Sequence, residues 1–127
     1  LHLLRGRAFT AAGEEARARG VRVVPAVVDD GGHLILLHRM DDTQVASVTV
    51  GIGKAKTAAI YRRASRDFEE QIRNGRVAAL ALADSTPLQG GIPITLGGKV
   101  IGAIGVSGDT PQVDEAIAIV GASTLGK

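Results

Sequence analysis

The segment over residues 90–121, GGIPITLGGKVIGAIGVSGDTPQVDEAIAIVG, constrains the fold more than any other part of the chain. Two apolar stretches flank Gly97 and Gly98, and a two-residue Gly-Gly turn suits a hairpin because both residues can adopt positive φ. Thr110 and Pro111 follow, a pair that is typical of a helix N-cap and first helical position. The segment therefore predicts two antiparallel strands and then a helix.

One face of the second strand is small along most of its length. Strand alternation places Ile101, Ala103, Gly105 and Ser107 on that face. Such a face allows close approach by another group, and three alternatives are open: a tightly packed helix, a neighbouring subunit or a flat ligand. A nucleotide is not indicated, since the Walker A and GxGxxG spacings are both absent.

Hydrophobic spacing and turn residues predict the remaining elements. We expect a helix over 3–19 that Gly20 stops, strands over 21–28 and 33–40, a helix from about 43 or 47 to 63, a helix capped by Ser65 that ends at Asn74 and Gly75, and a short helix within 76–89. Pro25 cannot donate to a strand ladder, which predicts an edge position or a bulge. The strand over 33–40 is apolar on both faces, which predicts a cover on both sides by helices, another subunit or one of each.

Two glycines and a lysine stand out within the helix over 47–63. Gly51 and Gly53 each cost about 1 kcal/mol relative to alanine in a helix interior, so we expect packing against another backbone to compensate. Lys54 lies on an otherwise apolar helix within KAKTAA. A lysine that lines a pocket could bind a carboxylate or a propionate, and a solvated helix edge is the simpler interpretation.

The composition limits the classes of function. The length of 127 residues predicts a single domain over 1–127. Aromatic residues make up 2% of the chain, too few to stack nucleic-acid bases, and the arginines are interleaved with acidic residues as on solvated helix faces. The absence of cysteine excludes disulfides, cysteine-bound metals and a thiol nucleophile.

No apolar run reaches the length of about 18 to 20 residues that spans a bilayer. We therefore expect a cytoplasmic protein without nucleic-acid or membrane partners, and leave open a targeting segment upstream of Leu1. His33 and His38 are the candidate metal ligands. Because they are five residues apart, a regular strand would place them on opposite faces, where they could not bind one metal together.

Three motifs in order, VVPAVVDDGGHLILLHRMDD, KAKTAA and GGIPITLGGKVIGAIGVSGDTPQVDEAIA, resemble the GlcG-like or HbpS-like family of small haem-binding domains. This family also occurs as the C-terminal domain of some PduO-type corrinoid adenosyltransferases. The resemblance implies a profilin-like α+β fold, with an antiparallel sheet of four to five strands flanked by α-helices, and assembly into homo-oligomers. Two positions depart from the family pattern: Asp42 stands where a glycine is common, and His38 where an aromatic residue is common.

Matching motifs imply a ligand pocket formed by Arg39, Met40, Asp41, Ser47, Lys54, Gly90, Gly91 and Asp114. His38 or His33 would be an axial ligand of haem, and Lys54 or Arg39 would meet a propionate. The leading hypothesis is thus a small oligomeric protein that binds haem or another tetrapyrrole and has an accessory role in a catabolic pathway. A small enzyme or accessory factor acting on an organic acid at a subunit interface, and a structural oligomerisation module, are the alternatives; catalytic residues and catalysis itself stay open.

Overall fold

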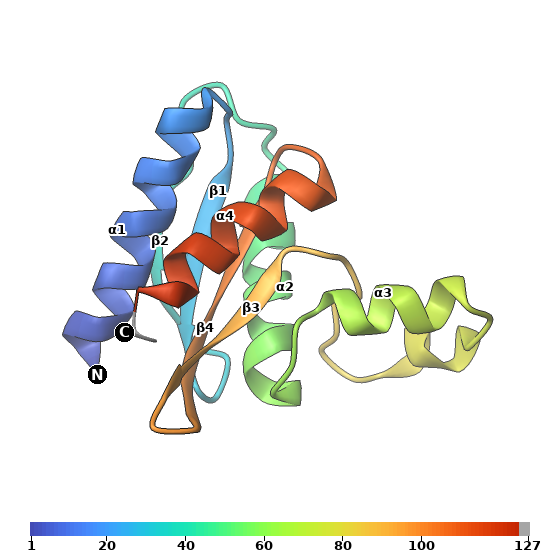
Figure 1. The fold of residues 1–127 in the computed structure, drawn as a ribbon. Coiled ribbons are helices and arrows are strands. Elements are labelled where there is room, and N and C mark those ends of the chain that lie inside the picture. Colours follow the sequence, from blue (N-terminus) through green and yellow to red (C-terminus); the bar gives the residue numbers. More distant parts are fainter. Residues whose placement is uncertain (125–127) are drawn as a thin grey trace.

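Four antiparallel strands form one open sheet in the order β2-β1-β4-β3 (Figure 1). In this computed structural model, which describes residues 1–124, the strands are β1 (Val24–Asp29), β2 (Leu34–Leu37), β3 (Gly91–Leu96) and β4 (Lys99–Ser107). β1 and β4 occupy the two central positions. The hairpin predicted around residues 97–98 is thus the β3–β4 half of the sheet.

Helices cover both faces of this sheet. α1 (His2–Arg19) and α4 (Pro111–Ser123) lie side by side on one face, and α2 (Ser47–Tyr61) lies on the other (Figure 1). α3 (Arg66–Arg73) and the 3₁₀ helix η1 (Val77–Ala81) project away from the sheet. This arrangement confirms the α+β fold with an antiparallel sheet flanked by helices.

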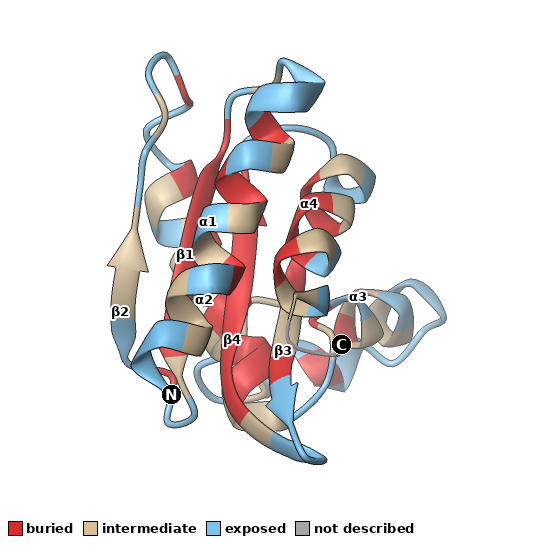
Figure 2. Ribbon diagram, turned by 60° about the vertical axis from the view of Figure 1, so that its left-hand side comes forward, coloured by how far each residue is buried: buried red, intermediate tan, exposed pale blue. Residues whose placement is uncertain are grey.

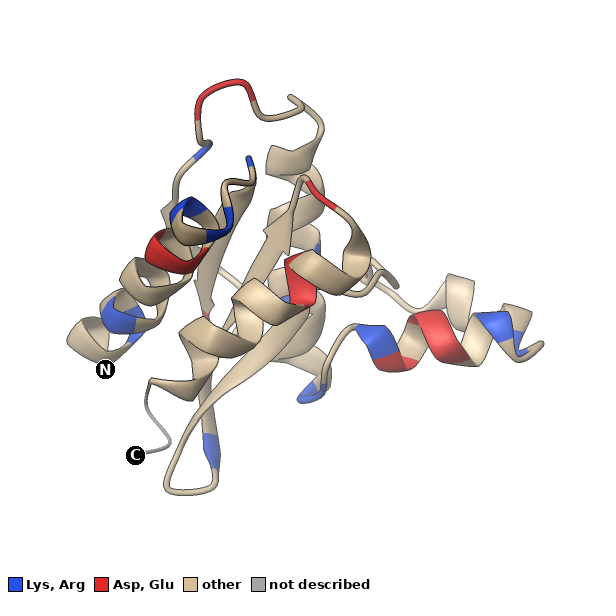
Figure 3. Ribbon diagram, turned by 45° about the horizontal axis from the view of Figure 1, so that its top comes forward, with Lys and Arg blue, Asp and Glu red and all other residues tan. Residues whose placement is uncertain are grey.

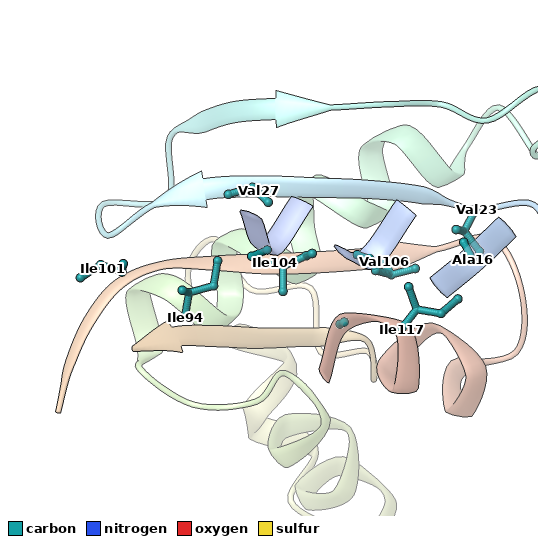
Figure 4. Close-up of a cluster of buried hydrophobic side chains, with 11 residues drawn as sticks. Ala16, Val23, Val27, Ile94, Ile101, Ile104, Val106 and Ile117 are labelled. Atoms are coloured by element: carbon teal, nitrogen blue, oxygen red, sulfur yellow. The ribbon is translucent and has the colours of Figure 1, made fainter. Parts of the chain in front are cut away.

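The larger core lies between the sheet and the layer of α1 and α4, and the buried positions follow β1, β4 and the inner faces of these helices (Figure 2). Because the chain has few aromatic rings, aliphatic side chains fill this core (Figure 4). Its fully buried members are Ala8, Ala12, Ala16, Val23, Val27, Ile94, Ile104, Val106, Ile117 and Ala118. The alanines of α1 allow the two helices to come close, since a Cβ on Gly121 of α4 would lie 2.6 Å from the Ala8 oxygen.

The small face of β4 packs directly on α2. A Cβ on Gly105 would overlap the Gly51 carbonyl oxygen and would lie 2.5 Å from the Ala55 nitrogen. Of the three alternatives for this face, the structure therefore shows a tightly packed helix. It also confirms the expected role of Gly51, whose Cβ would lie 3.1 Å from the Val24 oxygen of β1.

Ile101 departs from the predicted face. The register between β3 and β4 shifts after the pair Ile94–Gly102, because the next pair is Thr95–Val100. Ile101 is the extra residue of this irregularity and packs with the larger core instead of against α2.

The turn and the cap of the 90–121 segment are both confirmed. Gly97 and Gly98 adopt φ values of 58° and 80°, which suit a two-residue hairpin turn. Thr110 has extended backbone, and its hydroxyl oxygen accepts a hydrogen bond of 3.2 Å from the Val113 N–H at the start of α4.

Of the two alternatives predicted from Pro25, the edge position is wrong, because β1 lies between β2 and β4. The register irregularity of β1 lies between Val27 and Val28 and not at Pro25 itself. The His38 N–H donates to the Pro25 oxygen at 3.2 Å, and β2 has already ended at Leu37. The side of Pro25 that lacks an N–H therefore faces a segment beyond the regular ladder, where the missing donor costs little.

β2 is the edge strand next to β1 and is shorter than the predicted strand over 33–40. Val27 pairs with Leu36, whereas Val28 pairs with Leu34, so the register shifts between the two pairs. Residues opposite each other in a ladder lie on the same face of the sheet. Leu34 therefore lies on the face of Val28 and Leu36 on the face of Val27, whereas simple alternation predicts that the two leucines share a face. Leu36 packs against the larger core, while Leu34 remains 49% exposed. A cover for Leu34 from another subunit stays a prediction.

Ser65 precedes α3, as predicted, but its hydroxyl does not cap the helix. The Ser65 Oγ donates to the Leu88 oxygen at 2.6 Å and accepts a hydrogen bond of 2.8 Å from the Gly91 N–H. The sequence pattern predicted the position of Ser65 before the helix correctly, but not its hydrogen bonds. A buried hydroxyl bonds whichever backbone groups the tertiary fold places next to it.

Candidate functional site

Lys54 lies inside the protein and not on a solvated helix edge, which corrects the simpler interpretation. Its ammonium donates to the Val106 oxygen at 2.9 Å and forms an ion pair of 3.2 Å with Asp114 Oδ2. The side chains of Lys54 and Asp114 are only 4% and 3% exposed. α2 and α4 lie on opposite faces of the sheet, so this pair joins the two helical layers.

The backbone of Gly90 and Gly91 passes directly over this lysine. Gly90 has φ of 139°, and a Cβ there would lie 2.8 Å from both Cδ and Nζ of Lys54. A Cβ on Gly91 would overlap the Lys54 carbonyl oxygen. The structure thus brings together four of the eight predicted pocket residues: Lys54, Gly90, Gly91 and Asp114.

Burial controls the charge of Asp114. Desolvation raises the pKa of the Asp114 carboxyl above its ordinary value of 3.8, and the nearby Lys54 ammonium offsets this only in part. The second carboxylate oxygen accepts a hydrogen bond of 3.0 Å from the Asp109 N–H. Asp114 therefore fixes both Lys54 and the turn that precedes α4.

Asp114→Asn is expected to change how stability depends on pH. An acid with a raised pKa stabilises the folded state at low pH, and this contribution is lost as the pH rises from 3.8 through the raised value. Asparagine does not titrate, so the unfolding free energy of the wild type should fall relative to the variant across that interval. Denaturant unfolding at a series of pH values measures the difference; a difference independent of pH contradicts the raised pKa.

Glu115 belongs to the same buried region, and the sequence did not predict it as a site residue. Its Oε1 accepts hydrogen bonds from Arg66 at 3.2 Å and from Gln89 at 3.1 Å. Its Oε2 is buried and has no hydrogen-bond partner within residues 1–124. The available signal was helical spacing, since Glu115 lies one turn before the core residue Ala118.

The other four predicted pocket residues do not join this ion pair. Arg39 and Asp41 are exposed, and Met40 packs against the larger core. Ser47 is buried at the start of α2. The organic-acid alternative requires an inward lysine, which is present as Lys54, but the Asp114 carboxylate already neutralises it. Arg39, the other candidate, is exposed.

Both candidate axial ligands are accessible. His33 and His38 are exposed, and their backbone N–H groups bond Asp29 Oδ1 at 2.9 Å and the Pro25 oxygen at 3.2 Å. In the described part of the chain neither imidazole ring makes a hydrogen bond, and no cluster of three or more His, Cys, Asp or Glu residues could hold a metal ion. One free imidazole nevertheless suffices for a haem iron, which the porphyrin itself holds by four nitrogens.

Several surface charges pair within their own helix. Lys and Arg alternate with Asp and Glu along α1 and α3 (Figure 3). Arg19 contacts Glu15 at 2.7 Å and Arg73 contacts Glu69 at 3.0 Å, each one helical turn apart. This supports the interpretation of solvated helix faces. Among the helices of residues 1–124, none is long and apolar enough to cross a membrane.

Comparison with known proteins decides the family. The family model described as "Haem degrading protein HbpS-like" matches residues 6–123. The chain belongs to this family. Protein GlcG of Escherichia coli is 46% identical over 101 residues, which cover 79% of this chain and 75% of GlcG. An uncharacterized 15.0 kDa protein in the dhaT-dhaS intergenic region of Citrobacter freundii is 39% identical over 102 residues, covering 77% of this chain and 72% of that protein.

Solved structures of this HbpS-like fold are close to the chain in shape. Klebsiella pneumoniae protein ORFY has a TM-score of 0.90 at 28% identity, covering 99% of this chain and 90% of its own. A double mutant of Streptomyces reticuli HbpS has the same TM-score and identity, covering 100% of this chain and 87% of its own. A complex of PduOC with haem has a TM-score of 0.83 at 25% identity, covering 93% of this chain and 88% of its own.

Proposed function

We propose that this chain is a small homo-oligomeric protein that binds haem or a related tetrapyrrole on its outer surface beside β2. The support is twofold: an HbpS-like family described as haem-degrading, and a structural relative, PduOC, solved as a haem complex. The single structural observation that carries the proposal is the exposed imidazole of His38, which follows the apolar edge strand and has no competing hydrogen bond within residues 1–124.

The residues beside β2 fit the three needs of a haem. His38 supplies a nitrogen for the iron, and the adjacent Arg39 is exposed and able to pair with a propionate. The edge strand that precedes His38, Leu34–Leu37, consists of apolar residues that are all at least partly exposed and supply surface for the porphyrin ring. When bound, haem would supply iron chemistry that its axial ligand tunes. The chain's own residues bind and orient it from one side, and a second copy would shield the other.

An accessory role beside a catabolic pathway extends this proposal. Its support is the Citrobacter freundii relative, whose name places it between dhaT and dhaS. Growth of a strain lacking the gene, on the substrates of the neighbouring enzymes, tests this extension independently of haem binding.

Haem titration tests the leading proposal. The purified protein is expected to produce a saturable Soret band, and His38→Ala should weaken the binding at least about tenfold because an iron ligand is lost. His33→Ala tests the second candidate, and His2→Ala is the matched control, since His2 is also exposed but lies on α1. Absence of a saturable band overturns the proposal. A band unchanged in the double variant His33→Ala/His38→Ala overturns the assignment of the ligand.

A further inference from the structure

α1 terminates at one end of the sheet (Figure 1). An open hollow of about 420 Å³ is lined by residues that follow this helix end. Three segments distant in sequence form its walls: the α1–β1 connection, the loop before α2 and the turn before α4. Its lining includes Arg22, Asp42, Thr43, Gln44, Gly108 and Asp109. The lining is therefore mainly polar and has a volume typical of small-molecule sites.

The hollow carries charges of both signs. Arg22, Asp42 and Asp109 each come from a different wall. In the described structure, the side chains of Arg22 and Asp42 form no hydrogen bond or ion pair, and Asp109 Oδ2 only accepts a bond from the next residue's N–H. The three groups sum to one negative charge. The partial charges of the helix ends oppose each other, because the carboxyl end of α1 and the amino end of α4 both lie next to the hollow.

The walls are held by buried contacts. The Asp109 N–H bonds Asp114, which the ion pair with Lys54 fixes in turn. Gly108 has φ of 138°, and a Cβ there would lie 2.6 Å from the Arg22 oxygen, so this turn presses on the α1–β1 connection. The backbone of the walls is therefore held in place, while the charged side chains of Arg22, Asp42 and Asp109 are exposed and free to adjust to a ligand.

Asp42 lines the hollow from a strained backbone position. It adopts φ of 65°, in the left-handed region, where a residue other than glycine is strained by about 1 kcal/mol or more. A glycine would adopt this conformation freely. Arg62 and Asp84 adopt similar φ values of 57° and 56° outside the hollow, so the strain at Asp42 accompanies the site and does not by itself identify it.

We propose that this hollow binds a small zwitterion, with its ammonium group between Asp42 and Asp109 and its anionic group on Arg22. The two aspartates favour a cationic group, and the guanidinium of Arg22 favours a carboxylate or phosphate on the same molecule. The site goes beyond the proposed haem contact, because neither candidate axial histidine lines the hollow.

Calorimetric titration with three probes of similar size tests the charge requirement. 4-Aminobutyrate carries both groups, butylamine only the ammonium and butyrate only the carboxylate. We expect 4-aminobutyrate to bind most tightly, butylamine less tightly and butyrate least. Equal weak heats for all three probes, or tighter binding of butyrate than of butylamine, overturn the proposal.

Substitutions at the hollow separate binding from stability. Asp42→Asn and Asp42→Gly should each weaken 4-aminobutyrate about tenfold, the loss expected for a charged hydrogen bond. Asp42→Gly should leave the unfolding temperature unchanged or raise it, since glycine removes the backbone strain. Arg22→Gln should abolish the preference for 4-aminobutyrate over butylamine, and Asp30→Asn, an exposed aspartate outside the hollow, is the control. Unchanged affinity in all three hollow variants overturns the site, and the haem titration is unaffected by either result.

Discussion

Lys54→Met is expected to lower the free energy of unfolding by about 3 to 5 kcal/mol at neutral pH. The substitution keeps the length of the side chain but leaves the Asp114 carboxylate buried without its counter-charge, 3% exposed. The carboxyl would have to take up a proton or remain uncompensated, and both cost stability. The penalty should shrink at acidic pH, where Asp114 is protonated. Denaturant unfolding at neutral and acidic pH measures both effects.

Two matched variants show whether burial is the cause. Lys56→Met, two residues along α2, removes a half-exposed lysine whose contact with Asp84 is 3.6 Å, and should cost less than about 1 kcal/mol. The double variant Lys54→Met/Asp114→Asn should recover part of the loss, because no buried charge remains without a partner. Equal costs for Lys54→Met and Lys56→Met would contradict the importance of the buried pair.

Gly105→Ala is expected to destabilise the protein by about 3 kcal/mol, and in the extreme to prevent folding. Its methyl group would meet the backbone of α2 at Gly51 and Ala55, and backbone atoms cannot rotate away as a flexible side chain can. Separation of α2 from the sheet would also disturb Lys54, which α2 carries. Thermal and denaturant unfolding measure the loss.

Gly6→Ala is the control for this prediction. Gly6 lies within α1, where a Cβ would meet nothing within 4 Å. Alanine there should stabilise the protein by about 0.5 to 1 kcal/mol, since it lowers the entropy of the unfolded chain and favours the helix. The two substitutions add the same methyl group but are expected to change the free energy of unfolding in opposite directions. If both variants are destabilised by a similar amount, the loss comes from replacing a glycine as such and not from the contact with α2.

The sequence predicted the features that depend on neighbouring residues. The hairpin at Gly97 and Gly98 and the cap at Thr110 require backbone conformations that a few adjacent residues specify. The small face of β4 also predicted a close neighbour, but left three alternatives open. Gly51 of α2 was the matching half of that contact, since a Cβ on Gly105 would overlap the Gly51 oxygen, whereas a Cβ on Gly53 would meet the side chain of Thr86 and no backbone.

Features that depend on sheet order were predicted less well. Pro25 signalled an edge strand, yet β1 became central because the irregular segment after Leu37 tolerates the missing donor. Two register shifts moved Leu34 and Ile101 from the faces that simple alternation assigns. One extra residue in a strand is enough to reverse a face, and no pattern within the strand itself marks where it occurs.

The sequence alone determined the HbpS-like family and the apolar character of the strand that includes Leu34–Leu37, because motifs and periodicity are properties of the chain. Only the tertiary structure decided the state of the charged residues. Lys54 and Asp114 are 60 residues apart in sequence, and the same residue types at a surface would be solvated and nearly independent. Their burial between two helical layers couples them, and it positions the turn at Asp109 on the wall of the hollow.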